Sequence, residues 1–197
     1  MNKFYIRPRR TNTPDKRVQR TLYFAYGMNT NHGEMATRCP DSTFLGTAKL
    51  HNHRLTFQGV ADFTEHKGHT LHGALWLISA TDELALDRLE GYPHHYGKKT
   101  VQVSFKKGNI HVMIYQMVAR DNFSVPFQGY EDCLKVGYKQ SGMNLNQIDE
   151  AVSHAGKPRV KKWTFAEVLE EEYNDSVEEL DFTGHAYLPM QYKTRWK

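Results

Sequence analysis

The pattern of hydrophobic and polar positions predicts a sheet in the first half of the chain. Residues 22–26 form an apolar run rich in aromatics that ends at a glycine, which is typical of a strand buried on both faces. Residues 43–57 and 70–78 alternate or run apolar, with glycines between them. We therefore expect two or three further strands in this part of the chain.

A hairpin is expected next, with helices before and after it. Residues 101–105 and 110–114 alternate on either side of Gly108 and Asn109, a turn sequence, so two strands with one wet face each are predicted. Apolar spacing predicts helices at residues 31–38, 81–90, 130–140 and 145–152.

The helix at residues 81–90 has the clearest end signals. Thr81 is the expected N-cap, and Asp82 and Glu83 suit the positive N-terminal end of a helix. Gly91 follows the last helical residue and stops the helix. Glu90 is therefore expected at the C-terminal end.

These elements predict an α+β fold, a small mixed or antiparallel β-barrel flanked by helices. Residues 1–20 are basic and poor in apolar side chains, which predicts a mobile arm before a domain at residues 21–155. Residues 156–197 form a C-terminal extension, which we expect to dock on the core or on a partner. Within it, the acidic residues 164–181 predict an amphipathic helix.

Charge and composition describe a globular protein with a basic tail. The chain has 197 residues, 39% of them hydrophobic and 24% charged, which suits one principal domain and excludes collagen-like and low-complexity chains. Residues 1–20 contribute +6 to the net charge of +4, since they hold seven Lys and Arg against one Asp, and the remainder carries −2. The basic balance therefore belongs to the arm.

The expected compartment is the cytoplasm. Cys39 and Cys133 are too few for a disulfide framework and lack metal-ligand spacing. No stretch of about 18 apolar residues suggests a membrane span, and the basic N-terminus lacks the apolar stretch of a secretory signal. No membrane partner is therefore predicted, and the oligomeric state is left open.

Two features are candidates for chemistry. In residues 25–29 an apolar strand ends in a glycine, where successive N–H groups could bind an anion, although an ordinary turn explains the same pattern. Glu90 is expected among the unpaired carbonyls of a helix C-terminus, which disfavour a carboxylate and raise its pKa. A solvated glutamate is the alternative at that position.

Several segments in a fixed order carry a family resemblance. The most specific are the Tyr-Gly-x-Asn of residues 26–29 and, about sixty residues later, the Asp-x-x-Glu-Gly of residues 87–91. The others are residues 38–40 (RCP), 48–50 (AKL), 54–57 (RLTF), 71–76 (LHGALW) and 126–130 (PFQGY). Over residues 21–142 the chain resembles the gamma-glutamylcyclotransferase-like family, whose fold is a small β-barrel with flanking helices.

The resemblance implies a lyase reaction without a cofactor. In this family the free α-amine of a γ-glutamyl group attacks its own γ-amide carbonyl, which closes 5-oxoproline and expels an amine. One carboxylate can act as base and then as acid, and Glu90 matches that family position. Its pKa is expected to be raised toward neutrality.

The resemblance also implies a substrate site. The loop at residues 23–28 matches the family's cradle, whose backbone N–H groups would hold the α-carboxylate of the glutamyl moiety. Met28 stands where the family commonly has serine, which bears on substrate choice. The predicted substrate-binding residues are Tyr23, Phe24, Ala25, Tyr26, Gly27, Met28, Asn29, Tyr96 and Tyr130.

Other interpretations of the sequence lead elsewhere. His66, His69 and His72 suggest a metal site, but threefold spacing on a strand does not align ligands, so no metal is predicted. The basic arm at residues 1–20 could contact nucleic acid through phosphates, although a solvated tail is favoured. A catalytically idle binding or regulatory module, and an enzyme for a different γ-glutamyl compound, remain alternatives to the small-molecule lyase.

Overall fold

A computed structural model of the chain describes residues 20–119 and 122–156. The predicted arm up to residue 19, the extension from residue 157 and its helix at residues 164–181 lie outside the described residues. The elements are β1 (Arg20–Ala25), η1 (Met28–Thr30), α1 (His32–Arg38), β2 (Thr43–Phe57), β3 (Ala61–Ser79), α2 (Ala80–Leu89), β4 (Tyr96–Phe105), β5 (Gly108–Met117), α3 (Gln128–Gln140) and α4 (Asn146–Ala155).

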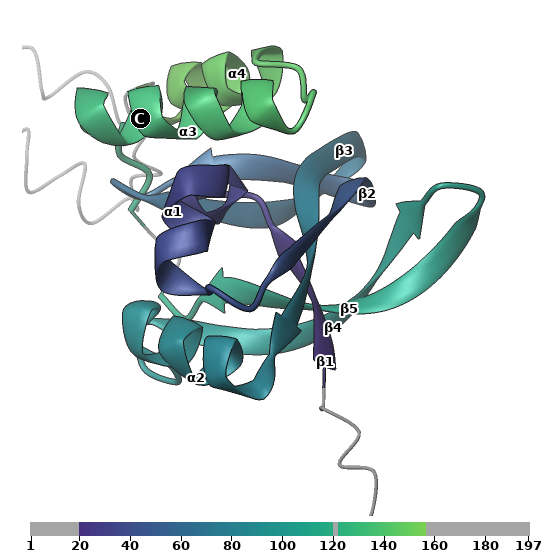
Figure 1. Cartoon of the computed structure of the whole chain (residues 1–197). Helices are drawn as coiled ribbons and strands as arrows, with labels where there is room; N and C mark the ends of the chain where they lie inside the picture. Colours follow the sequence, from purple (N-terminus) through teal and green to yellow (C-terminus); the bar gives the residue numbers. More distant parts are fainter. Residues whose placement is uncertain (1–19, 120–121, 157–197) are drawn as a thin grey trace, which may run out of the picture. The chain divides into compact units, whose positions relative to one another are not determined.

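The strands form a closed barrel in the order β1-β3-β2-β4-β5 (Figure 1). All neighbouring strands pair antiparallel except β1 and β5, which close the barrel through a parallel contact of Tyr23 with Met113. The predicted α+β barrel flanked by helices is confirmed. Within the described residues, no helix combines the length and apolarity needed to cross a membrane.

Strand β3 is longer than its apolar pattern predicts. It begins at Ala61 rather than near residue 70, and it continues through Gly68, whose φ is +84°. The partner strand β2 has a register shift between His51 and His53, where Asn52 has a φ of 59°. The first half of β3 includes exposed polar residues, so alternation alone did not mark it as strand.

Two local predictions are wrong. The β4–β5 turn lies at Lys106 and Lys107, and Gly108 is already paired with Phe105, because Lys106 itself takes the left-handed conformation at φ 52°. Helix α2 is capped by Ser79 rather than by Thr81. The Ser79 hydroxyl accepts from the Asp82 N–H while the Asp82 carboxylate accepts from the Ser79 N–H, a capping box.

Two apolar clusters divide the faces of β1. Phe24 points into the barrel interior, a cluster that also takes in α3 and α4. Tyr23 and Ala25 point the other way, into a second cluster where Leu86 anchors α2. Because Leu86 is fully buried against β1 and β3, the C-terminal end of α2 lies beside the loop that follows β1.

Candidate active site

A cavity of about 240 Å³ lies where the loop after β1 meets the end of α2. The loop at residues 26–29, the loop before β3, the end of α2 and the strands β4 and β5 all contribute to its walls. Its lining residues are Tyr23, Tyr26, Gly27, Met28, Asn29, Arg38, Val60, Ala61, Leu89, Glu90, Tyr96, Tyr115 and Tyr130.

Glu90 is the C-cap of α2, and its backbone N–H donates to the Leu86 carbonyl at 2.8 Å. Its carboxylate enters the cavity, where Oε1 accepts a hydrogen bond from Asn29 Nδ2 at 3.1 Å. Burial raises the pKa of Glu90 from 4.5 to about 7, although Arg38 and the Asn29 amide act in the opposite direction. A carboxyl group with this pKa exchanges a proton readily near neutral pH.

Arg38 determines how Asn29 is oriented. Its Nη1 donates to Asn29 Oδ1 at 2.7 Å, and its Nη2 pairs with Glu34 at 2.7 Å. With Oδ1 so engaged, Asn29 presents its amide nitrogen to Glu90 and, at 3.0 Å, to the Tyr23 hydroxyl. The amide therefore stabilises the ionised form of Glu90.

The loop after β1 leaves little space for a side chain at Gly27. A Cβ at Gly27 would lie 3.0 Å from the Ala61 Cβ and 3.2 Å from the Tyr130 hydroxyl, both in the cavity wall. The chain then forms the single turn η1, in which Thr30 N–H bonds to the Gly27 carbonyl. The first N–H groups of such a turn, those of Met28 and Asn29, have no acceptor within it, and the Met28 N–H bonds to the Tyr130 hydroxyl instead.

Buried tyrosines make up much of the remaining wall. Tyr96 donates its hydroxyl to the Ala61 carbonyl at 2.7 Å, and the Tyr130 hydroxyl accepts from the Ala61 N–H at 3.1 Å. Burial raises the pKa of Tyr130 to about 12 and raises the pKa of Tyr96 further still. These phenols stay neutral at physiological pH, so Glu90 is the group in this wall that is suited to moving protons.

Tyr115 is held in the wall by a network beneath the cavity. Its hydroxyl donates to Asp87 at 2.6 Å, and Lys98 pairs with the same carboxylate at 2.8 Å. The Tyr115 carbonyl accepts from the Tyr26 hydroxyl at 2.7 Å. Asp87, one helical turn before Glu90, therefore acts on the site through Tyr115.

The structure brings together the predicted site residues with two exceptions. Phe24 and Ala25 do not line the cavity: Phe24 points into the barrel interior, and Ala25 is buried in the second apolar cluster. The sequence-based prediction omitted Arg38, Val60, Ala61, Leu89 and Tyr115. Arg38 lies within a motif quoted above, yet nothing in its spacing indicates that it reaches Asn29.

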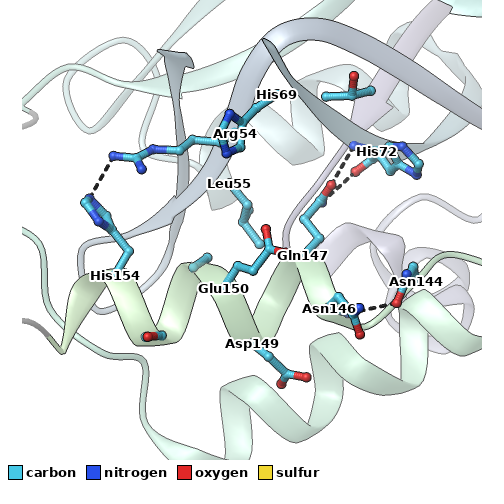
Figure 2. A pocket seen from close by; sticks show the side chains of 13 residues that line it. Arg54, Leu55, His69, His72, Asn144, Asn146, Gln147, Asp149, Glu150 and His154 are labelled. Carbon is cyan, nitrogen blue, oxygen red and sulfur yellow. Dashed lines mark hydrogen bonds between the residues drawn. The ribbon is translucent and has the colours of Figure 1, made fainter. Parts of the chain in front are cut away.

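A larger cavity of about 680 Å³ lies between α4 and the strands β2 and β3 (Figure 2). The Gln147 side chain spans from α4 to β3, where it accepts from the His72 N–H at 2.7 Å and donates to the His72 carbonyl at 3.0 Å. Arg54 Nη2 lies 2.9 Å from His154 Nε2. We call this cavity the α4 groove. Across residues 20–119 and 122–156, no cluster of three His, Cys, Asp or Glu side chains is arranged to hold a metal ion.

Comparison with known proteins agrees with this architecture. Three solved structures share the fold: a gamma-glutamyl cyclotransferase, 23% identical with a TM-score of 0.61, an uncharacterized human protein, 24% and 0.60, and YkqA from Bacillus subtilis, 20% and 0.60. The matches cover 80%, 79% and 71% of this chain and 99%, 98% and 55% of those proteins. No curated protein sequence matches the chain significantly.

A family model decides the relationship. The model described as gamma-glutamyl cyclotransferase, AIG2-like, matches residues 23–132, more than half of the chain. This range includes the loop after β1, the end of α2 and the start of α3, which together build the smaller cavity. The resemblance found in the sequence is confirmed: the chain belongs to the gamma-glutamyl cyclotransferase, AIG2-like family.

Proposed function

We propose that the protein is a gamma-glutamylcyclotransferase-type lyase that converts a small γ-glutamyl compound to 5-oxoproline and a free amine. The observation that carries the proposal is the Glu90 carboxylate, which lies in the smaller cavity with a pKa raised to about 7. The Asn29 amide donates a hydrogen bond to this carboxylate, and the tyrosines around it stay neutral. We therefore assign proton transfer to Glu90.

The reaction moves two protons from the α-nitrogen to the leaving nitrogen. Glu90 takes the first proton from the substrate's α-ammonium, the freed amine nitrogen forms a bond to the γ-carbonyl carbon, and Glu90 gives that proton to the leaving nitrogen. When the tetrahedral intermediate collapses, the bond from that carbon to the leaving nitrogen breaks. Glu90 then takes the second proton from the ring nitrogen, which becomes the lactam N–H, and passes it to the released amine, which departs as an ammonium. The cavity holds the glutamyl chain folded for ring closure, which contributes to the rate through proximity.

The loop after β1 is the proposed cradle for the α-carboxylate. The N–H groups of Met28 and Asn29 begin the turn η1. The Met28 N–H bonds to the Tyr130 hydroxyl, so a bound α-carboxylate would replace that hydroxyl as its acceptor. Backbone donors hold an anion whatever the side chain is, so Met28 in place of serine is compatible with binding. Tyr96 and Tyr130 also line the cavity, with the Tyr130 hydroxyl next to Gly27.

The proposed compartment is the cytoplasm. The support comes from the sequence, whose two cysteines are too few for a disulfide framework. Cell fractionation with an antibody to the protein tests this assignment, and recovery outside the cytoplasmic fraction would contradict it.

The test is release of 5-oxoproline from γ-glutamyl amino acids, γ-glutamylamines and glutathione. The Glu90→Gln variant keeps the shape of the side chain but cannot cycle a proton, so we expect turnover to fall by about 10³-fold or more. Glu150→Gln, the same change at an exposed position of the α4 groove, is the matched control. Lack of turnover by the unchanged protein on the whole panel would favour the binding-module interpretation instead.

A further inference from the structure

The tyrosine hydroxyls in the wall of the smaller cavity differ in where their protons go. Three of them donate to fixed protein acceptors: Tyr26 to the Tyr115 carbonyl, Tyr96 to the Ala61 carbonyl and Tyr115 to the Asp87 carboxylate. The hydroxyls of Tyr23 and Tyr130 accept hydrogen bonds, and within residues 20–119 and 122–156 neither donates one to the protein. Their protons are therefore available to a ligand in the cavity.

Tyr23 is held firmly by the barrel. It lies in β1, where it pairs with Trp76 of β3 and with Met113 of β5 at the point where the barrel closes. Its ring packs edge-on against Tyr115 with the centroids 5.8 Å apart, and only 3% of the residue is exposed. A hydroxyl fixed in this way on a strand keeps its position when a ligand binds.

A chain of hydrogen bonds that starts at a positive charge ends at the Tyr23 oxygen. Arg38 Nη1 donates to Asn29 Oδ1 at 2.7 Å, and Asn29 Nδ2 donates to the Tyr23 hydroxyl at 3.0 Å. Each bond polarises the next, so a phenol that accepts from this chain donates its own proton more strongly. Burial raises the pKa of Tyr23, so the hydroxyl keeps its proton at physiological pH.

The same amide nitrogen places the Tyr23 hydroxyl beside Glu90. Asn29 Nδ2 lies 3.0 Å from the Tyr23 oxygen and 3.1 Å from Glu90 Oε1. In the proposed reaction Glu90 exchanges protons with two nitrogens that are both bonded to the γ-carbonyl carbon. The γ-carbonyl oxygen must then lie close to Glu90 without being bonded to its carboxylate, and the Tyr23 hydroxyl is a donor in that neighbourhood.

The Tyr130 hydroxyl lies at the other end of the proposed substrate. It accepts from the N–H groups of Ala61 and Met28, and the Met28 N–H is one of the donors proposed for the α-carboxylate. The glutamyl chain separates its α-carboxylate from its γ-carbonyl. Of the two available phenols, Tyr23 is therefore the one on the side of the reacting atoms.

We propose that the Tyr23 hydroxyl is a catalytic donor that stabilises the negative charge on the γ-carbonyl oxygen in the tetrahedral intermediate. The inference rests on the proposed function, because it adds an oxyanion donor to the same reaction. As the α-amine lone pair forms the C–N bond, the electrons of the carbonyl π bond move to the oxygen, which accepts from Tyr23. When the intermediate collapses, the C=O bond re-forms and the bond to the leaving nitrogen breaks. Tyr23 keeps its proton throughout.

Tyr23→Phe tests the assignment, because it removes the hydroxyl and keeps the ring. Loss of one oxyanion donor lowers kcat by about 10²–10³-fold in well-characterised enzymes. A water molecule entering the vacated place would recover part of this effect, so we expect kcat to fall about 30-fold while KM changes less than about threefold. Tyr92→Phe is the matched control, because Tyr92 is 44% exposed and does not line the cavity. Unchanged kcat in Tyr23→Phe, or an equal loss in Tyr92→Phe, would overturn the proposal.

The pH profile distinguishes an oxyanion donor from a residue that only holds Asn29 in place. The bond from the Asn29 amide lowers the pKa of Glu90, so a displaced Asn29 would shift the acidic limb of the kcat/KM profile to higher pH. Loss of an oxyanion donor lowers the rate at every pH and leaves the limb where it was. A shifted limb with an unchanged plateau would therefore contradict the proposal.

Binding tests the donor without turnover. The probes are the γ-methylphosphinate analogue of glutamate, whose tetrahedral phosphorus carries an anionic oxygen, and the planar γ-glutamylmethylamide. Both are titrated calorimetrically against Glu90→Gln and against the double variant that also carries Tyr23→Phe. We expect the second substitution to raise the Kd of the phosphinate at least about tenfold and that of the methylamide less than about threefold.

These measurements separate failure of the donor from failure of the lyase. If the unchanged protein turns over no compound but the phosphinate alone loses affinity in the double variant, the lyase proposal fails and the donor assignment stands. If turnover occurs and the Kd of the phosphinate does not rise, the lyase stands and the donor assignment fails. An equal rise in both Kd values, or no binding of the phosphinate to Glu90→Gln, also overturns the donor assignment.

Discussion

The smaller cavity and the α4 groove differ in how the central polar side chain of each is compensated. The α4 groove measures about 680 Å³ against about 240 Å³, and its Gln147 bonds to the His72 backbone with both amide atoms, although the buried Arg54 Nε has no hydrogen-bond partner among the described residues (Figure 2). In the smaller cavity, burial leaves Glu90 only partly compensated by Asn29 and Arg38, and its pKa rises to about 7.

The proposed site of chemistry is therefore the smaller of the two cavities. Polar groups that satisfy one another stabilise the contact between elements, as Gln147 does between α4 and β3. A carboxylate held in a partly apolar wall costs free energy in the folded protein, and a cost of this kind is typical of a functional group.

After the loss of turnover in Glu90→Gln, the largest expected effect comes from moving the carboxylate. Glu90→Asp withdraws the carboxylate by one methylene, about 1 Å or more from the reacting atoms, so we expect kcat to fall about 100-fold. The same change at Glu150 in the α4 groove should alter kcat by less than about twofold. Steady-state release of 5-oxoproline measures kcat for both variants. Comparable losses of kcat would contradict the proposal that only the smaller cavity carries the reaction.

Stability should respond to the same carboxylate with a defined pH dependence. The pKa of Glu90 is raised on folding, so the folded protein binds more protons than the unfolded chain between about pH 4.5 and 7, and stability is lost as pH rises through that window. Glu90→Gln removes this loss and should stabilise the protein by about 2 kcal/mol at pH 8. Below about pH 4.5 the carboxyl group is protonated in both states, so the gain should vanish.

Urea unfolding of both proteins at pH 8 and at pH 4 measures the free energy of unfolding. Gln is the matched substitution, because its Oε1 can still accept from the Asn29 amide. A variant less stable than the unchanged protein at pH 8 would show that the Glu90 carboxylate is fully compensated in the folded state.

A substitution in the α4 groove should change the stability of the protein without changing its catalytic rate. Gln147→Ala removes the two bonds to the His72 backbone and the 2.6 Å bond to the Tyr138 hydroxyl, so we expect a loss of about 1–2 kcal/mol. Thermal unfolding should register that loss while kcat/KM stays within about twofold. A tenfold loss of kcat/KM in the folded variant would make the α4 groove part of the active site.

The smallest effect should come from Arg38. Its positive charge lowers the pKa of Glu90, so Arg38→Gln raises that pKa further and moves the acidic limb of the kcat/KM profile to higher pH. At pH 7 the rate should fall about threefold and recover at pH 8.5. Arg54→Gln in the α4 groove is the control, and a shifted limb in that variant would show that the effect is not local to Asn29 and Glu90.

Local sequence signals were sufficient for much of the fold. The apolar run at residues 22–26 marked β1, and the residues from Asp82 to Gly91 marked α2 and placed Glu90 at its end. The predictions of the α2 N-cap and of the β4–β5 turn were wrong, because in each case a neighbouring residue took the expected position. Ser79 took the cap because Asp82 could complete a capping box with it, and Lys106 took the left-handed turn position although Gly108 stood nearby.

The sequence by itself determined the family, the barrel with flanking helices and the candidate acid-base residue, because these depend on short-range periodicity and on motifs contiguous in the chain. Only the tertiary structure decided that Arg38 orients Asn29 toward Glu90 and that Tyr115 completes the wall. Asn29 and Glu90 lie 61 positions apart in sequence, and Asn29 lies far in sequence from Tyr115 as well. These contacts arise from the closure of the barrel and the packing of Leu86, which no local pattern records.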